Sequence, residues 1–588
     1  MGARVQVRKL CRPPRFFPLF FFLNFGWLLG TGHPESLAVP SPELRGVWVD
    51  AFHSGYKNEA QVAKLFHDLR LARINTVFVQ VRKRGDAYYR SDFVPKATDI
   101  APDFDPLDSI LRHANSSTNH PPIEVHAWFV MYPIWNRQSA PPKAANHLFN
   151  AKPDWLGVNA QGATWDGANH NLDPGHPAVQ EHLTRVVTEV IARYPVDGIH
   201  FDYIRYPGNQ WGYNRSSLER FNRRFRRAGK PSPSSSAWLQ FRRDQVTSLV
   251  RRLYLTSQTH DPKLKVSAAL ICFAPGILRS QEWSSSAAYS SVLQDWRLWM
   301  EQGILDLAIP MAYFNQRSHA QDWGRWNQFI KEHQYQRQAA IGMGWFLNES
   351  SASIEQLSTT RKASRAGNFT QGFVGFSYAN HAANRDDWPS FADRLARNPE
   401  NPDARLTTPV TIPSMPWKDS PLKGHFLGRA HWNRSPPPFE PVIIKLENSS
   451  HEVRMECDAN GYFGTTDLPP GLYRLSIETP FQFGPIEGQE IQIGEVTEID
   501  LDLATALAPT LSVETMTVDH MEVVITPWFL NLSYILQTKK NLDEAEWTMA
   551  PLENERPNND SSTASFQVET GPDQRFFRVL VKPLIADE

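Results

Sequence analysis

Cysteine is scarce in this chain, which has three in 588 residues. Cys11 lies in the N-terminal segment, and Cys272 and Cys457 are far apart, in regions that we assign below to different domains. Such spacing argues against a disulfide framework and against a zinc site built from cysteine. His-x-His and His-Glu-x-x-His spacings are missing as well. The sequence therefore predicts no metal site and no cofactor.

An excess of charge is also lacking, because 61 basic residues are matched by 62 acidic ones. This balance gives no reason to expect a nucleic acid or an anionic membrane as a partner. No glycine-rich phosphate loop follows any expected strand, which argues against a nucleotide-binding open sheet. The apolar stretch at residues 16–29 is shorter than the ~20 residues that a membrane-spanning helix needs.

The first forty residues predict a signal for export. Basic residues precede the apolar stretch, and the small residues up to Ala38 suit cleavage by a signal peptidase. We therefore expect residues 1–38 to be a signal peptide and the mature protein to be exported. Its location would be the cell envelope, periplasmic or extracellular, with no stable membrane anchor.

Residues 43–398 alternate between apolar runs typical of strands and amphipathic runs typical of helices. Eight strands are expected, at residues 44–51, 74–81, 123–131, 198–203, 264–270, 305–311, 338–344 and 372–377. Eight strands separated by helices fit a closed (β/α)8 TIM barrel, of class α/β. A doubly wound open sheet is the alternative.

The pattern changes after the barrel. Residues 399–422 are rich in proline and predict a linker or a strap along the barrel. Residues 423–504 show short alternating strands around a turn, and they resemble β-sandwich modules of the carboxypeptidase-regulatory-like, transthyretin-like type. Residues 505–588 alternate again and predict a second small all-β sandwich of a fibronectin-like kind.

Residues 196–207, Val-Asp-Gly-Ile-His-Phe-Asp-Tyr-Ile-Arg-Tyr-Pro, form the most informative segment. An expected helix at 176–193 leads into a buried strand that ends at Asp202. Strand alternation places His200 and Asp202 on one face. An α/β barrel carries its catalytic groups at such strand ends. Asp202 could instead cap the next segment or pair with Arg205, but the aromatic and basic residues around it favour a site.

This strand resembles the fourth-strand motif of α-amylase-type glycosidases, in which the second Asp is the nucleophile. The barrel as a whole resembles the glycosyl-hydrolase-like family 10 proteins over about residues 43–390. The matching segments are 44–49, 74–82, 126–129, 196–207, 294–296 and 303–311. The resemblance implies an exported glycoside hydrolase that acts on bacterial cell-wall (peptidoglycan) glycan strands or on another polysaccharide.

Glycoside hydrolysis needs two carboxyl groups, one of which protonates the leaving oxygen. Asp202 matches the nucleophile of the amylase-type motif, but the fifth strand lacks the Glu that the amylase pattern would place at its end. The proton donor therefore stays open among Glu282, Asp295 and Asp322, with Glu282 the first choice. A non-catalytic carbohydrate-binding barrel would explain the same features and also the missing acid. A metal-dependent hydrolase ranks last.

Other strand ends and the long loop at residues 133–172 supply candidates for binding the sugar. Aromatic rings can stack on sugar faces, although each is equally well suited to a core. Basic side chains could hold an acidic group of the substrate or neutralise nearby carboxylates. The substrate-binding candidates are Trp48, Asp50, Gln80, Arg82, His126, Trp128, Asn171, Asp173, His200, Arg205, Tyr206, Tyr313, Trp345 and Tyr378.

Overall fold

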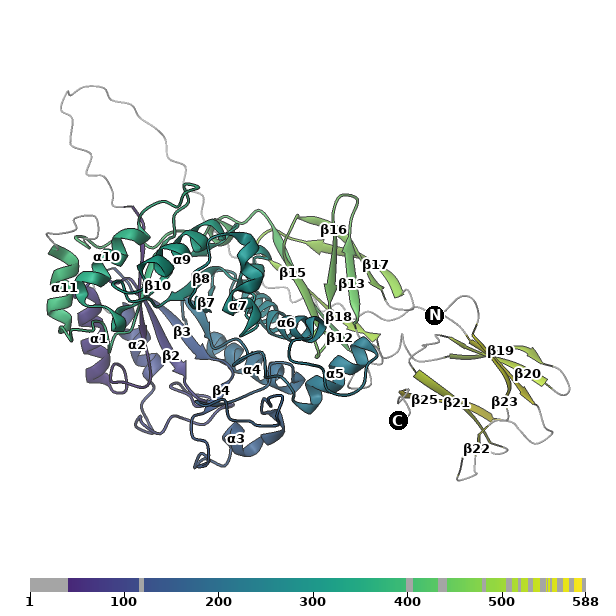
Figure 1. The fold of residues 1–588 in the computed structure, drawn as a ribbon. Coiled ribbons are helices and arrows are strands. Elements are labelled where there is room, and N and C mark those ends of the chain that lie inside the picture. The colour runs from purple at the N-terminus through teal and green to yellow at the C-terminus, as the bar shows by residue number, and fades with distance from the viewer. Residues whose placement is uncertain are drawn as a thin grey trace, which may run out of the picture.

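The computed structural model describes residues 41–115, 121–397, 406–431, 441–478 and 483–503, and beyond them residue 546 and strands between residues 510 and 583. The expected signal peptide at residues 1–38 and residues 399–405 of the expected linker lie outside the described residues. Figure 1 shows a barrel wrapped by helices, with green β-sheets packed beside it and yellow strands beyond them. Within the part described, no helix is long and apolar enough to cross a membrane.

Eight parallel strands close into the TIM barrel that the sequence predicts. Their order is β10-β11-β1-β2-β3-β6-β7-β8, and pairing of β8 with β10 closes the ring. The strand expected at 338–344 is interrupted at Ala340, so that a short β9 (Gln338–Ala339) precedes β10. The barrel strands are β1 (Leu44–Val49), β2 (Thr76–Arg82), β3 (Glu124–Val130), β6 (Gly198–Asp202), β7 (Lys265–Ile271), β8 (Leu307–Ala312), β10 (Ile341–Gly344) and β11 (Gly372–Phe376).

Helices surround the barrel and bury one apolar face each against the strands. In the first helix, for example, Val62, Leu65 and Phe66 are fully buried. The principal helices are α1 (Glu59–Leu71), α2 (Pro106–Asn115), α4 (Pro177–Arg193), α5 (Arg215–Phe225), α6 (Ser236–His260), α9 (Ala320–Glu332), α10 (Ser350–Thr360) and α11 (Trp388–Arg397).

The apolar spacing of residues 287–302 predicts a single helix, and this prediction is wrong. The segment contains two short helices, α7 (Ala287–Ser290) and α8 (Trp296–Glu301). Leu293 has a φ of 57°, a left-handed conformation that interrupts a right-handed helix. Asp295 then begins α8, because its carboxylate accepts a hydrogen bond from the Leu298 N–H.

The forty-residue loop after β3 is ordered by short elements of its own. These are β4 (Pro133–Trp135), α3 (Leu148–Ala151), a 3-10 turn at Pro153–Trp155 and β5 (His170–Asn171). The strands β4 and β5 pair antiparallel. The loop is therefore structured, and it starts at the C-terminal end of β3, the end at which a barrel carries its site.

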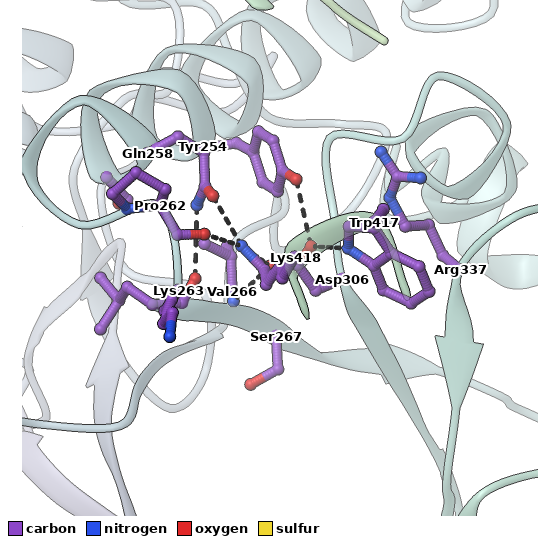
Figure 2. Close-up of polar contacts among 12 residues, drawn as sticks. Tyr254, Gln258, Pro262, Lys263, Val266, Ser267, Asp306, Arg337, Trp417 and Lys418 are labelled. Carbon is purple, nitrogen blue, oxygen red and sulfur yellow. Dashed lines mark hydrogen bonds and ion pairs between the residues drawn. The ribbon is translucent and has the colours of Figure 1, made fainter. Parts of the chain in front are cut away.

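The described part of the proline-rich segment is a strap across the N-terminal end of the barrel. Its backbone carbonyls at Thr408 and Thr411 accept hydrogen bonds from Arg45 Nη1 and the Glu43 N–H, at 2.7 and 2.9 Å. A short helix, α12 (Pro416–Asp419), ends the strap. Figure 2 shows Trp417 and Lys418 of this helix inserted beside Asp306, which precedes β8.

Two sheets follow the strap and share one hydrophobic core. Their strand orders are β15-β12-β18 and β14-β13-β16-β17. Phe426, Ile444 and Leu475 are buried in this core. The strands are β12 (Gly424–His431), β13 (Ile443–Glu447), β14 (Glu452–Glu456), β15 (Tyr462–Leu468), β16 (Gly471–Glu478), β17 (Phe483–Ile491) and β18 (Val496–Asp502). Their likeness to carboxypeptidase-regulatory-like modules stays a prediction.

The β12–β18 region is docked on the barrel through buried charged groups. The Arg252 guanidinium of α6 lies 3.7 Å from the centre of the Tyr462 ring, and Arg337 Nη2 lies 2.7 Å from Asp467 Oδ2. These contacts hold the β12–β18 region against the outside of the barrel.

The C-terminal strands form two further antiparallel sheets, with orders β19-β20-β24-β23 and β22-β21-β25. They are β19 (Thr510–Met516), β20 (His520–Thr526), β21 (Leu532–Lys539), β22 (Thr548–Met549), β23 (Leu552–Pro557), β24 (Ala564–Glu569) and β25 (Phe576–Pro583). All-β structure is what the sequence predicts here, and its fibronectin-like character stays a prediction.

Candidate active site

A cavity of about 850 Å³ lies at the C-terminal end of the barrel. Side chains that follow β1, β2, β3, β6, β7 and β8 converge on it, together with residues of the long loop. Several residues singled out from the sequence meet there, and they are Trp48, Asp50, Gln80, Trp128, Asp202, Arg205 and Tyr313. Among the described residues that line the cavity, the carboxylates are Asp50 and Asp202.

Asp202 is a buried carboxyl at the end of β6. Its Oδ1 accepts a hydrogen bond of 2.6 Å from the Tyr203 N–H and lies 3.6 Å from Arg205 Nη1. Burial raises the pKa of Asp202 above its ordinary value, and Arg205, the Tyr203 N–H and Trp128 oppose this effect. The carboxyl therefore keeps its proton to a higher pH than an exposed aspartate would.

Tyr203 adopts an unfavourable backbone conformation next to this carboxyl. Its φ of 50° is in the left-handed region, which an aromatic residue rarely occupies. The Arg205 guanidinium lies 4.1 Å from the centre of the Tyr203 ring. Strained backbone is concentrated at functional sites, where the surrounding structure maintains it. The conformation therefore adds to the reasons for placing the site here.

Asp50 follows β1 and is held by the turn after it. Its Oδ1 accepts hydrogen bonds from the Phe52 and His53 N–H groups, at 2.9 and 3.1 Å, and lies 2.8 Å from His53 Nδ1. Gln80 fixes the same turn, because its Oε1 accepts the Ala51 N–H at 2.8 Å. The carboxyl thus reaches the cavity from a well-ordered backbone.

The floor of the cavity is held by a chain of hydrogen bonds inside the barrel. The Trp48 indole N–H donates to His200 Nε2 at 3.0 Å, so His200 carries its proton on Nδ1 and donates it to Ser267 Oγ at 2.9 Å. Burial, with a smaller effect from His126, lowers the pKa of His200 well below its usual value. His200 is therefore a neutral ring that positions Trp48.

Glu282, the first choice for the proton donor, lies outside the cavity lining. Its carboxylate closes a short 3-10 turn, accepting the Leu278 and Arg279 N–H groups at 2.7 and 2.9 Å. It also lies 3.2 Å from Arg325 Nη2. The two backbone hydrogen bonds, with help from Arg325, lower the pKa of Glu282. A carboxyl held in its ionised form is a poor proton donor.

Asp295 and Asp322 also lie outside the lining. Asp295 accepts hydrogen bonds from the Trp283 indole at 2.9 Å and from the first turn of α8. Asp322 accepts the Gly276 N–H at 2.7 Å. Both carboxylates therefore fix loops behind β7 and β8. In sequence, an acid with such a role looks the same as an acid that faces the cavity.

Two further candidates are fully buried in or against the barrel. Arg82 Nη1 donates to the carbonyls of Val130 and, at 2.9 Å, Met131, and burial lowers its pKa to about 10. His126 lies in the lower half of the barrel, where its ring occupies the space that a Cβ on Gly198 would need. Arg82 thus belongs to the packing around the C-terminal end of β3, and His126 to the packing inside the barrel.

The remaining candidates make structural contacts away from the lining. Asp173 accepts the Ser217 hydroxyl at 2.6 Å, and burial raises its pKa. The Tyr378 hydroxyl donates to Asp68 Oδ2 at 2.7 Å. The others placed outside the lining are Asn171, which donates to Asp166, Tyr206, which is buried near Arg242, and Trp345, which packs against Gly375.

The structure adds residues that the sequence analysis did not select. Phe52 and Phe273 line the cavity just after β1 and β7, and Asn169 and Asn315 line it from the long loop and the β8 end. Their positions directly after strands, or in the long loop, were the available signal. In the described part of the chain, no group of three or more His, Cys, Asp or Glu residues is placed to hold a metal.

A closed TIM barrel with carboxyl groups at the C-terminal ends of its strands is an architecture shared by many hydrolases. The family model for glycosyl hydrolase-like 10 proteins matches residues 43–349, more than half of the chain. The chain therefore belongs to the glycosyl hydrolase-like 10 family.

Two named relatives are glycosyl hydrolases. The chain is 28% identical to glycosyl hydrolase DigH of Escherichia coli (strain K12) over 323 residues, 48% of this chain and 69% of that protein. It is 24% identical to glycosyl hydrolase YngK of Bacillus subtilis (strain 168) over 424 residues, 64% of this chain and 74% of that protein. The glycoside hydrolase domain of PgaB (BpsB) from Bordetella bronchiseptica aligns over 63% of this chain and 100% of its own, with a TM-score of 0.43 and 11% identity.

Proposed function

We propose that this protein is an exported glycoside hydrolase that acts on cell-wall glycan or another polysaccharide. The observation that carries the proposal is the meeting of two carboxyl groups, Asp50 and Asp202, in one cavity at the catalytic end of a TIM barrel. The glycosyl hydrolase names of the relatives support the reaction. The basic and apolar N-terminal segment supports export.

Asp202 is the key carboxyl in this proposal, and Asp50 replaces Glu282 as the first choice for its partner. Hydrolysis needs one carboxyl to protonate the leaving oxygen and another to stabilise or trap the sugar cation. The raised pKa of Asp202 favours the role of donor, because a donor must hold its proton at the working pH. The role of nucleophile requires the ionised form, which Arg205 and the Tyr203 N–H stabilise against burial. The hydroxyl of Tyr313 and the indole of Trp128 complete the polar surface around it.

Asp50→Asn tests the partner assignment. We expect the change to reduce kcat on natural glycan by about a hundredfold or more, because one of two required carboxyl groups is lost. If Asp50 is the donor, the loss in kcat should be much smaller for aryl glycosides with good leaving groups, because these need little protonation. The measurement is kcat on glycan and on aryl glycosides of graded leaving-group pKa.

Glu282→Gln is the matched control. It should leave kcat unchanged on both glycan and aryl glycosides, because Glu282 lies in a loop turn outside the cavity lining. If Glu282→Gln shows the leaving-group dependence and Asp50→Asn behaves like the wild type, the donor belongs to the loop after β7.

Arg205→Gln tests the electrostatic coupling in the cavity. The positive charge of Arg205 lowers the pKa of Asp202, so its removal should raise that pKa further. If Asp202 is the nucleophile, the acid limb of the kcat/KM profile moves to higher pH; if it is the donor, the alkaline limb does. Arg84→Gln, which removes another cavity arginine, should leave the limb in place. If neither limb of the kcat/KM–pH profile moves in Arg205→Gln, or if one moves to lower pH, the coupling between Arg205 and Asp202 is contradicted.

A non-catalytic carbohydrate-binding barrel remains the second candidate. It is favoured by one observation, the absence of Glu282, Asp295 and Asp322 from the described lining of the cavity. Under this alternative, the purified protein binds glycan but releases no new reducing ends. Measuring glycan binding and the release of reducing ends by the wild-type protein therefore separates the two functions.

A further inference from the structure

Aromatic side chains are exposed around the mouth of the cavity. Phe52 is 49% exposed, Phe273 51% and Tyr203 41%, and all three line the cavity. Large apolar side chains in water are unfavourable, and when exposed rings gather around a site they mark a binding surface. These exposed rings therefore favour the binding of a ligand that has apolar faces of its own.

Phe52 and Phe273 stand on opposite sides of the mouth. Phe52 follows β1 and Phe273 follows β7, and these strands are four positions apart in either direction around the eight-stranded ring. Asp202 ends β6, which is next to β7, and Asp50 directly follows β1. A straight path from one phenyl ring to the other therefore crosses the mouth of the cavity that both carboxyl groups line.

Both rings are attached to a fixed backbone. The Phe52 N–H donates to Asp50 Oδ1, and the Arg84 guanidinium lies 4.6 Å from the centre of the Phe52 ring. The Phe273 carbonyl accepts a hydrogen bond of 3.0 Å from the indole of the buried Trp326. Ordered rings lose little conformational entropy when a ligand covers them, which favours affinity.

From this placement we propose that Phe52 and Phe273 are two sugar-stacking subsites on opposite sides of the carboxyl pair. A sugar ring has an apolar C–H face for each phenyl ring and hydroxyl groups for the polar cavity between them. A ligand that reaches both is a chain that continues in both directions from the cavity. This inference rests on the proposed function and extends it: the substrate is a polymer, and cleavage is internal.

The test measures binding as a function of chain length. Glycan strands from peptidoglycan are fractionated into disaccharide, tetrasaccharide and octasaccharide, and their affinities are measured by calorimetry on Asp202→Asn protein. We expect affinity to rise with length. Adding Phe52→Ala or Phe273→Ala should weaken octasaccharide binding by about three- to tenfold and leave disaccharide binding unchanged.

Phe369→Ala is the matched control, because Phe369 is 54% exposed but is not among the cavity residues. It should not change any affinity. The subsites are overturned if affinity does not depend on chain length. They are also overturned if octasaccharide affinity is unchanged in both phenylalanine variants. Equal losses for disaccharide and octasaccharide do so as well.

A second readout separates this inference from the proposed function. If the binding pattern holds and the wild-type protein releases no reducing ends, the subsites stand and the hydrolase proposal fails. If the wild-type protein hydrolyses octasaccharide but releases only terminal units at early times, internal cleavage is wrong. Internal fragments that appear first and become rarer in Phe52→Ala and Phe273→Ala support it.

Discussion

Asp202→Asn is expected to reduce glycan hydrolysis by at least about a thousandfold while the protein stays folded and still binds glycan. The amide has nearly the same shape as the carboxyl, and its oxygen can still accept the Tyr203 N–H. It can neither trap a sugar cation as a carboxylate does nor donate a proton as a carboxylic acid does. Turnover, circular dichroism and calorimetric glycan binding measure the three properties.

Asp173→Asn is a control with the same chemical change at another buried aspartate. The pKa of Asp173 is also raised by burial, but its carboxylate accepts the Ser217 hydroxyl away from the cavity. This variant should lose some thermal stability and keep its kcat. If Asp202→Asn instead fails to fold, Asp202 is structural; if it keeps its turnover, another group is the key carboxyl.

The barrel and the position of Asp202 could be predicted from the sequence because both follow from local patterns. Apolar runs separated by amphipathic helices indicate parallel strands, and period-two alternation places His200 and Asp202 on one face of β6. The structure confirms the barrel and places Asp202 in the cavity at its C-terminal end. The alternation does not show how deep in the barrel a side chain lies. His200, which lies deeper in the barrel than Asp202, was therefore also predicted to bind substrate.

The partner carboxyl could not be predicted, because its position depends on how a loop turns. Glu282 follows β7 in sequence, but its carboxylate turns back to the backbone of Leu278 and Arg279. Asp50 follows β1, and the turn after it leaves the carboxyl in the cavity lining. Asp50 also closes a turn, since it accepts the Phe52 and His53 N–H groups. An acid that only closes a turn and one that also lines a cavity therefore share the same local sequence features.

The opposite end of the barrel depends on contacts that no local pattern indicates. The sequence left residues 399–422 as a linker or a strap, and the described part is a strap that inserts Lys418 beside Asp306 (Figure 2). Lys418 Nζ lies 3.0 Å from Asp306 Oδ2, and both side chains are buried. Asp306 also accepts the Trp417 indole at 2.7 Å and the Val266 N–H at 2.9 Å. One carboxylate thus joins the strap to β7 and β8.

Asp306→Asn is expected to destabilise the protein by about 3–5 kcal/mol, because it leaves Lys418 as a buried charge without its counterion. Burial already lowers the pKa of Lys418, and Asp306 opposes that effect. The Gln258 side chain and the Pro262 carbonyl also accept hydrogen bonds from Lys418, but neither carries a charge. The free energy of unfolding, measured in urea with tryptophan fluorescence, reports the loss.

A double-mutant cycle completes the test of the strap. Lys418→Met should also be destabilising, and Asp306→Asn with Lys418→Met should cost less than the two single changes added together, since neither charge is then left alone. Glu219→Gln, in the exposed Arg215–Glu219 pair, should have no measurable effect. Because the strap closes the end of the barrel opposite Asp202, kcat below the unfolding transition should be the same in all four variants. Additive losses would mean that Lys418 and Asp306 contribute independently, and a reduced kcat would mean that the strap also acts on the site.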